Sequence, residues 1–276
     1  NYHRLLIPRI LLLGMIRLSN WNHAWELGLI FLLACLSFTW LACQPWKIHA
    51  IHAAPAPWWA ILLPALLLFS PSQWQVWLWG WHVCIAIVAA GLYGACGALS
   101  CQSRAAFPTA LVMAVLLSYS MLNGLVIWPA GLLAILLAGG KRVAWRATLW
   151  AACGTVTVAV YMHGLKGDGS LPAFSSLASD ALNFTVYVLA FLGNPIVNYH
   201  LYGAALAGVA GLVLFLAGII LAVRSGSIPR PEAAVWFGIA ACSVGCALML
   251  AIGSHHHGLI HALSSRYSVF ANGLSI

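Results

Sequence analysis

Residues 108–139 read "PTALVMAVLLSYSMLNGLVIWPAGLLAILLAG", an apolar run that is too long to be a single membrane-spanning helix. A spanning helix needs about 20 mostly apolar residues. This run carries turn and helix-breaking signals at its centre, the pairs Asn123-Gly124 and Trp128-Pro129. Such a break is tolerated at membrane depth only where protein or a water-filled cavity shelters the freed backbone groups. We therefore predict a hairpin of two short helices, Pro108–Met121 and Pro129–Gly139.

The chain as a whole has the composition of an integral membrane protein. Apolar residues make up 63% of the 276 and charged residues only 6%, whereas soluble domains are roughly a quarter charged. We expect an all-α, polytopic helical bundle with short or broken helices, as one transmembrane domain over residues 1–276. The sequence opens on Asn1 and ends in what looks like the start of another span, so we expect a piece of a longer chain. The other predicted spans are Trp25–Cys43, a short Trp58–Phe69, Val76–Ser100, Val143–His163, Ile196–Val223 and Ala233–Ile252.

The basic residues predict the orientation, because cytoplasmic loops of membrane proteins carry an excess of Lys and Arg. Alternating spans place one such set on a single side: Lys47, Arg104, Lys141, Arg142, Arg146, Arg224 and Arg230. The opposite, external face receives most of the polar stretches, so we expect any chemistry there. Residues 1–24 are predicted to be an external interfacial segment. Residues 164–195 are predicted to be an external loop in which Ala181–Pro195 forms a short interfacial helix.

The net charge of +8 comes from twelve Lys and Arg against four acids. These cations lie in short loops, so they predict contact with membrane lipids rather than with nucleic acid. The eight cysteines fall almost entirely inside apolar runs, with neither a Cys-x-x-Cys motif nor His at zinc spacing. We interpret them as small buried hydrophobic residues.

Near the end of the chain, "GSHHHGLIHALSSRYSVF" (253–270) gathers polar side chains. His257 and His261 are four apart and would share a helix face, a spacing that suits a divalent metal, but a third ligand is missing. We therefore assign no cofactor, and we regard a divalent metal ion at these histidines as the less favoured alternative. A haem between His82 and His163 is a weaker alternative still. The external loop 164–195 begins with a glycine-rich turn that contains Lys166 and Asp168. These two side chains either contact a substrate or are solvated.

Two groups of arginines need anionic partners in a chain with so few acids. Arg4, Arg9 and Arg17 lie in an amphipathic stretch that either rests on lipid headgroups or clamps phosphates. Arg266 stands at the mouth of a new apolar run, where an unpaired guanidinium is costly. Its partner is either a ligand anion or a lipid phosphate reached by snorkelling.

Four segments resemble, in order, those of the glycosyltransferase C superfamily, the bacterial polytopic transferases that use polyprenyl-phosphate sugars. They are "NYHRLLIPRI", "SYSMLNGLVIWPAGLLAIL", "LAFLGNP" and "SSRYSVF". The resemblance implies a helical core in the bacterial inner membrane, an external active site and a lipid-linked sugar donor. It also implies a catalytic acid in a first external loop, which we expect upstream of Asn1, so no catalytic base is named.

Carried onto this sequence, the resemblance implies that His3, Arg4 and Arg9 line the rim of the site and that Asn123 shapes the pocket floor. It assigns the donor phosphate to Arg266, with Tyr267 beside it in the same motif. The expected function is transfer of a sugar from a polyprenyl-phosphate carrier to an acceptor on the external face.

Two other classes of function stay open. The chain could be a non-catalytic subunit that packs against other membrane subunits through its 14 tryptophans. It could also be a transporter, or a carrier of metal ions or protons that uses His side chains. Metal content of the purified protein separates the last of these from the others.

Overall fold

The computed structural model describes residues 4–51, 59–101, 103, 105–163, 180–254 and 258–275, and the described residues form helices and turns without a strand. Arg104 and four of the predicted site residues, His3, Lys166, Asp168 and His257, lie outside this described part. Six segments within it are long and apolar enough to cross a membrane, which indicates a multi-pass membrane protein. They are Ala24–Gln44, Ile61–Leu78, Gly80–Leu99, Val143–Met162, Leu201–Arg224 and Arg230–Ser254.

The predicted hairpin is present. Helix α6 (Ala106–Ser118) is followed by a 3-10 turn, η3 (Leu122–Val126), and by α7 (Ile127–Ala138). A Cβ atom at Gly124 would collide with the Leu117 carbonyl, so only glycine lets the turn pack directly on the α6 backbone. Pro129 is the third residue of α7, where its missing N–H costs no intrahelical hydrogen bond. The second helix therefore starts two residues before the predicted Pro129.

Two predicted spans differ from the structure. Val76–Ser100 is not one helix: α4 (Trp74–Leu78) is followed by η2 (Gly80–His82) and then by α5 (Val83–Ser100). At the break, a Cβ atom at Gly80 would collide with the Glu26 carboxylate, so the contact with α2 (Ala24–Ile51) requires glycine there.

The other difference is at the predicted span Ile196–Val223. Helix α11 (Leu201–Arg224) starts five residues later than predicted. His200 defines its N-terminus, because Nδ1 of that side chain accepts a hydrogen bond from the Gly203 N–H at 2.9 Å.

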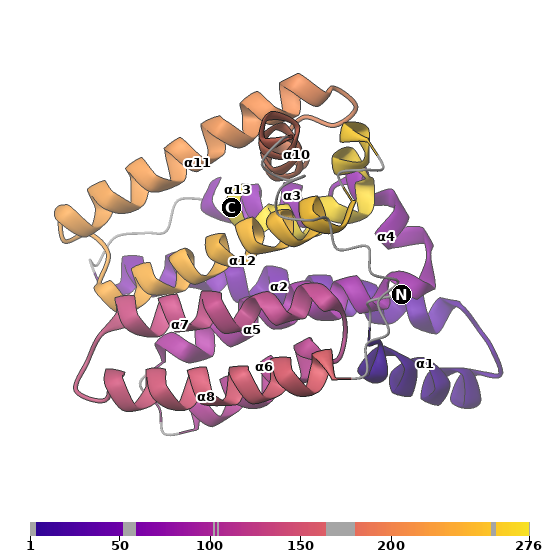
Figure 1. The fold of residues 1–276 in the computed structure, drawn as a ribbon, viewed down its shortest axis with the longest axis horizontal. Coiled ribbons are helices and arrows are strands. Elements are labelled where there is room, and N and C mark those ends of the chain that lie inside the picture. Colours follow the sequence, from indigo (N-terminus) through magenta and orange to yellow (C-terminus); the bar gives the residue numbers. More distant parts are fainter. Residues whose placement is uncertain are drawn as a thin grey trace.

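Helices α5, α7 and α12 (Arg230–Ser254) pack against one another in the middle of the bundle. Helix α6 and α8 (Val143–Met162) lie along one side of it, and α10 (Ala181–Gly193) crosses α11 on the other (Figure 1). The stretch expected to begin another span forms α13 (Ser268–Ser275), whose residues 268–274 are all buried. The end of the described chain therefore enters the core (Figure 1). The remaining helices are α1 (Leu6–Ser19), α3 (Trp59–Leu68) and the 3-10 helices η1 (Pro71–Gln73), η5 (Leu259–Leu263) and η6 (Ser265–Tyr267).

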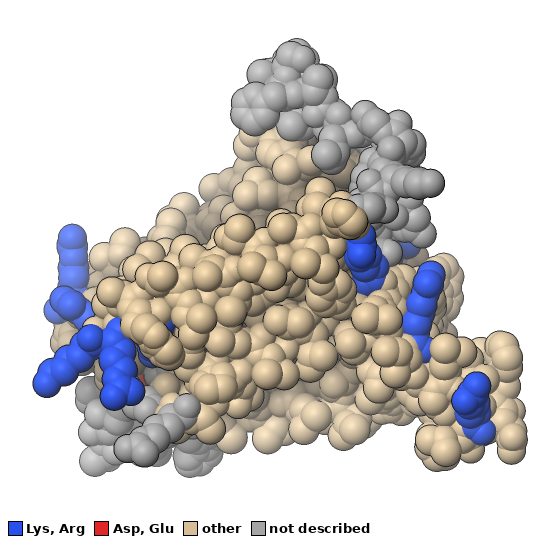
Figure 2. Space-filling model, turned by 60° about the horizontal axis from the view of Figure 1, so that its bottom comes forward, with Lys and Arg blue, Asp and Glu red and all other residues tan. Residues whose placement is uncertain are grey.

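The loops gather at two ends of the bundle. The α7–α8 and α11–α12 connections lie together at one end, and α1, α4 and the segment 258–267 lie at the other (Figure 1). We name them the basic end and the histidine end. On the face shown in Figure 2, Lys and Arg side chains group together at one end and stand apart from one another at the other, with a surface free of them in between. Cations of the described part at the basic end are Lys141, Arg142, Arg146, Arg224 and Arg230, and those at the histidine end are Arg4, Arg9, Arg17 and Arg266. This grouping agrees with the alternation that the sequence predicts.

Replacing Gly208 with Ala should destabilise the fold. A Cβ atom at this position would collide with the Leu189 carbonyl of α10, and a backbone atom cannot move aside cheaply. We expect Gly208→Ala to lower the thermal unfolding midpoint of the detergent-solubilised protein by about 4 °C or more. The control is Gly218→Ala on the same helix, where a Cβ has nothing within 4 Å. Equal midpoints for the two variants would contradict the tight α10–α11 crossing.

Candidate functional site

A hollow of 430 Å³ lies at the histidine end, and we name it the polar hollow. Three segments that are far apart in the sequence meet there: α4, the turn before α11, and η5 with the start of η6. Its lining residues are Trp74, Gln75, Asn198, Tyr199, His200, Leu201, Ile260, Leu263, Ser264 and Ser265. Amide, imidazole and hydroxyl groups thus share the wall with two aromatic rings.

Two groups of this lining are buried without a protein hydrogen-bond partner in the described part of the chain, the Ser265 hydroxyl and the Asn198 amide nitrogen. Ser265 is only 6% exposed. Leaving such a group unpaired costs about 1–3 kcal/mol. Water or another polar molecule in the hollow would offset that cost, so both groups are available to an occupant of the hollow.

The other polar groups of the wall are held in place by the fold. The Ser264 hydroxyl donates to the Gln75 side-chain oxygen at 3.2 Å, which ties η5 to α4. The Gln75 backbone carbonyl lies 2.7 Å from Nδ1 of His82, whose ring stacks on Trp79 at 5.3 Å between centroids. His82, considered above for haem, therefore braces the break between α4 and α5.

Arg266 follows Ser265 and begins a chain of four polar side chains. Its guanidinium lies 5.0 Å from the centroid of the Tyr267 ring and donates to the Tyr267 oxygen at 3.3 Å. That oxygen is 3.5 Å from Nε2 of His261, and Nδ1 of His261 is 3.1 Å from the Tyr187 oxygen. The structure thus joins three residues of the predicted site region, and it adds Tyr187 from α10.

A guanidinium can only donate, so the Tyr267 oxygen accepts from Arg266. A neutral imidazole has one donor and one acceptor nitrogen, so the His261 ring links the Tyr267 and Tyr187 hydroxyls. Burial raises the pKa of the Tyr187 phenol above its ordinary value, and the neighbouring Tyr267 phenol acts in the same direction, so Tyr187 stays protonated at neutral pH.

No carboxylate balances the Arg266 charge within the described residues, where the one ion pair is His23 with Glu26 at 3.2 Å. Arg266 is half-buried, held by an aromatic face and a phenol oxygen. A cation in this setting favours an anionic ligand.

The N-terminal arginines take a different place at the same end. The Arg4 backbone N–H donates to the Tyr161 oxygen at 3.1 Å, and its guanidinium donates to the His163 carbonyl. Arg4 therefore fastens the start of the chain to the end of α8, and Arg9 is exposed on α1. No contact of the described part joins either residue to Arg266.

Asn123, predicted at the pocket floor, is 2% exposed within the core. Its backbone carbonyl accepts from the Cys246 thiol of α12 at 4.0 Å, and its amide nitrogen has no partner among the described groups. It is not part of the polar hollow.

Within the described residues, no group of three His, Cys, Asp or Glu side chains could hold a metal. The described residues contain no disulfide. Cys84, Cys96, Cys242 and Cys246 are buried as predicted, whereas Cys35 and Cys153 are half-buried and Cys43 and Cys101 are exposed, which corrects the prediction for these four.

Tyr187, Gln75, Asn198 and the burial of Ser265 were not predicted from the sequence. The signal for Asn198 was present: "GNPIVNYH" (193–200) interrupts an apolar run with polar and turn-forming residues. Tyr187 and Phe191 are four apart on α10 and share its buried face, but nothing in the sequence links that face to His261. Contacts between segments this distant come only from the packing.

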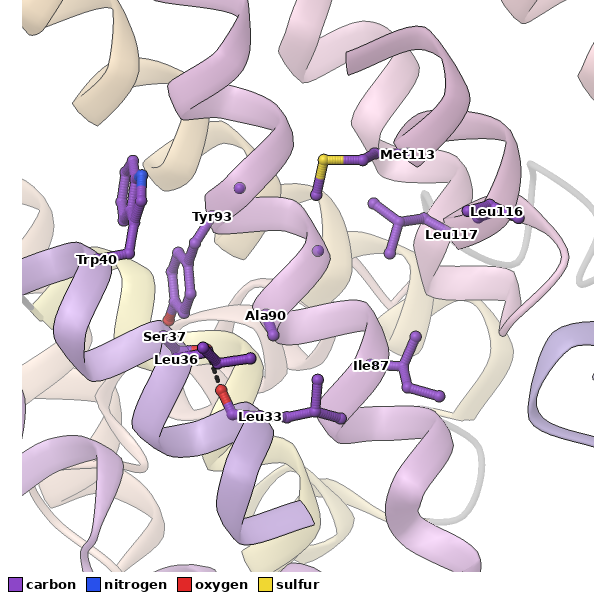
Figure 3. A pocket seen from close by; sticks show the side chains of 12 residues that line it. Leu33, Leu36, Ser37, Trp40, Ile87, Ala90, Tyr93, Met113, Leu116 and Leu117 are labelled. Atoms are coloured by element: carbon purple, nitrogen blue, oxygen red, sulfur yellow. Dashed lines mark hydrogen bonds between the residues drawn. The ribbon is translucent and has the colours of Figure 1, made fainter. Parts of the chain in front are cut away.

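An apolar groove of 360 Å³ lies between α2 and α6, with α5 as its floor (Figure 3). Gly91 and Gly94 on α5 let side chains of α6 pack directly on the α5 backbone. A Cβ at Gly91 would collide with Leu117, and a Cβ at Gly94 would collide with Met113. The Ser37 hydroxyl donates to the Leu33 carbonyl at 2.8 Å. The other O–H and N–H groups of the lining side chains belong to the aromatic residues Tyr93 and Trp40. The groove suits a hydrocarbon chain. Its lining residues are Leu33, Leu36, Ser37, Trp40, Ile87, Ala90, Gly91, Tyr93, Gly94, Met113, Leu116 and Leu117.

Comparisons of this chain with protein-family profiles, with curated proteins and with solved structures give no match.

Replacing Tyr187 with Phe should lower the stability of the histidine end. The substitution removes the oxygen that lies 3.1 Å from His261, at a position that is fully buried. A lost buried hydrogen bond costs about 1 kcal/mol, or a fall of about 2–4 °C in the thermal midpoint. Tyr202→Phe on α11, where the tyrosine is 66% exposed, is the matched control and should leave the midpoint unchanged. A Tyr187→Phe variant as stable as that control would remove Tyr187 from the chain of polar contacts.

Proposed function

We propose that the protein is a transferase of the bacterial inner membrane that moves a sugar from a polyprenyl-phosphate carrier to an acceptor on the external face. The histidine end is then the external end. The observation that supports this most is the half-buried Arg266, which has no carboxylate partner among the described residues and follows directly on the lining of the polar hollow.

Arg266 would bind the phosphate of the donor. A guanidinium pairs with phosphate oxygens through two parallel N–H groups, and Tyr267 fixes its plane from one side. In an inverting transfer the acceptor oxygen forms a bond to the anomeric carbon as the bond to the phosphate oxygen breaks, and the proton of the acceptor hydroxyl passes to a general base. Negative charge collects on the departing polyprenyl phosphate, and a cation placed there lowers the barrier.

The polar hollow would hold the sugar. Its volume of 430 Å³ is within the range of small-molecule sites. The Asn198 amide and the Ser265 hydroxyl supply unpaired hydrogen-bonding groups for sugar hydroxyls. Trp74 and Tyr199, 41% and 82% exposed, offer aromatic faces at the rim. A sugar ring has apolar C–H faces and hydroxyl groups around its edge, so it matches such a lining.

The apolar groove would take part of the isoprenoid tail. Between Leu33 and Trp40 it follows α2 over about 10 Å, at a rise of 1.5 Å per residue. Its wall is lined by aliphatic and aromatic side chains (Figure 3). Burial of prenyl methylene and methyl groups contributes roughly 25 cal/mol per Å² of apolar area removed from water, although lipid competes for the same surface.

Arg266→Gln tests this proposal. With the full-length protein in nanodiscs and a panel of polyprenyl-phosphate hexoses and pentoses, we expect turnover to fall by about 100-fold or more, because the departing phosphate loses its cation. Arg266→Lys keeps the charge without the planar fork and should retain partial activity. The control is Arg17→Gln, at an exposed arginine in the last turn of α1, and it should behave as wild type.

Undiminished turnover in Arg266→Gln would remove Arg266 from the donor site. If the wild-type protein neither turns over nor binds any donor of the panel, the non-catalytic subunit becomes the better assignment. In that case, the exposed Trp79 and Trp81 at the histidine end are the first surface to test for a partner subunit.

A further inference from the structure

A second cavity, of 680 Å³, lies at the opposite end of the molecule, and we name it the basic cavity. It is enclosed by the start of α6, the α7–α8 turn and the first turn of α8. The described lining contains three cations and no acid: it consists of Cys101, Ser103, Phe107, Pro108, Gly139, Gly140, Lys141, Arg142, Val143, Trp145 and Arg146.

Arg146 is the most constrained of the three cations. Its Nη2 donates to the Leu99 carbonyl at the end of α5, and its guanidinium lies 5.1 Å from the centroid of the Phe107 ring. Its Nε–H group is buried and has no partner among the described groups. One edge of the guanidinium is therefore anchored, whereas another buried N–H group still lacks an acceptor.

The α7–α8 turn places two more charges on the rim. Lys141 and Arg142 are exposed and directly precede α8. The turn depends on glycine, since φ is +67° at Gly139 and +102° at Gly140, a region that other residues rarely adopt. The positive end of the α8 dipole adds to the field of the three side chains.

We propose that the basic cavity binds a phosphate group, carried either by the headgroup of an anionic phospholipid or by free inorganic phosphate. Three cations line it without an acid in the described lining, and the unpaired Arg146 Nε–H would find an acceptor in a phosphate oxygen. Basic pockets between membrane helices are suited to anionic headgroups. Trp145 is 59% exposed on the same wall and provides an amphipathic ring at headgroup level. This site is independent of the proposed transferase activity.

Native mass spectrometry of the detergent-solubilised full-length protein tests the proposal. The protein is mixed with phosphatidylglycerol or with phosphatidylcholine, and bound lipid is counted with and without millimolar inorganic phosphate. The variants are Arg146→Gln and the double variant Lys141→Gln/Arg142→Gln. The control is Arg224→Gln/Arg230→Gln, which removes two exposed charges at the same end outside the cavity lining.

We expect wild type and control to retain phosphatidylglycerol over phosphatidylcholine, and the two cavity variants to retain it at least about fivefold less. Retention that resists inorganic phosphate identifies the lipid headgroup as the source of the phosphate, and displacement by millimolar phosphate identifies the free anion. Equal retention by the cavity variants and the control, or no preference of wild type for phosphatidylglycerol, overturns the proposal. Because Arg146→Gln also removes the contact with Leu99, the exposed double variant decides the outcome if Arg146→Gln does not fold.

Discussion

A break in an apolar helix frees backbone carbonyls, and at the end of α3 this molecule satisfies one of them with side-chain amides. The Leu67 carbonyl near the end of α3 illustrates the constraint, because the residue four positions later is Pro71, which has no N–H to offer. Two side-chain amides replace it: Gln73 donates to this carbonyl, and Asn272 of α13 donates to it at 3.3 Å. An apolar environment makes such pairing obligatory, so the short α3 and the buried α13 depend on each other.

Two tryptophans hold the α6–α7 hairpin together and fix it to the neighbouring helix α8. The Trp128 indole donates to the Ser118 hydroxyl at 2.9 Å, and the Trp150 indole of α8 donates to the Trp128 carbonyl at 2.8 Å. Both rings are almost fully buried, and they lie 4.9 Å apart between centroids. The broken hairpin is thereby fixed against α8. Tryptophan suits this position because its large apolar ring fills space while its indole N–H donates a hydrogen bond.

Local signals in the sequence were sufficient to predict the α6–α7 hairpin, the extent of α10 and the long apolar helices. The break at Trp79–His82 was not predicted, and there Gly80 packs directly against Glu26 of α2, a contact between segments that are far apart in the sequence. The polar hollow was not predictable from the sequence either, because residues near 75, 198 and 264 meet only in the folded chain. Arg266 was found from its charge in an apolar context, and its partners His261 and Tyr187 required the three-dimensional structure.

Three half-buried arginines are held in one common way, by an aromatic face and an oxygen acceptor: Arg4 by Tyr161 and the His163 carbonyl, Arg146 by Phe107 and the Leu99 carbonyl, and Arg266 by the ring and oxygen of Tyr267. Neutral groups of this kind orient a guanidinium without cancelling its charge. With so few acids in the chain, that charge is left for an anion. Arg146 lines one cavity and Arg266 adjoins another, whereas Arg4 lines none of the cavities described above and spans two chain segments. The same arrangement therefore braces the fold at Arg4 and favours an anion site at the other two.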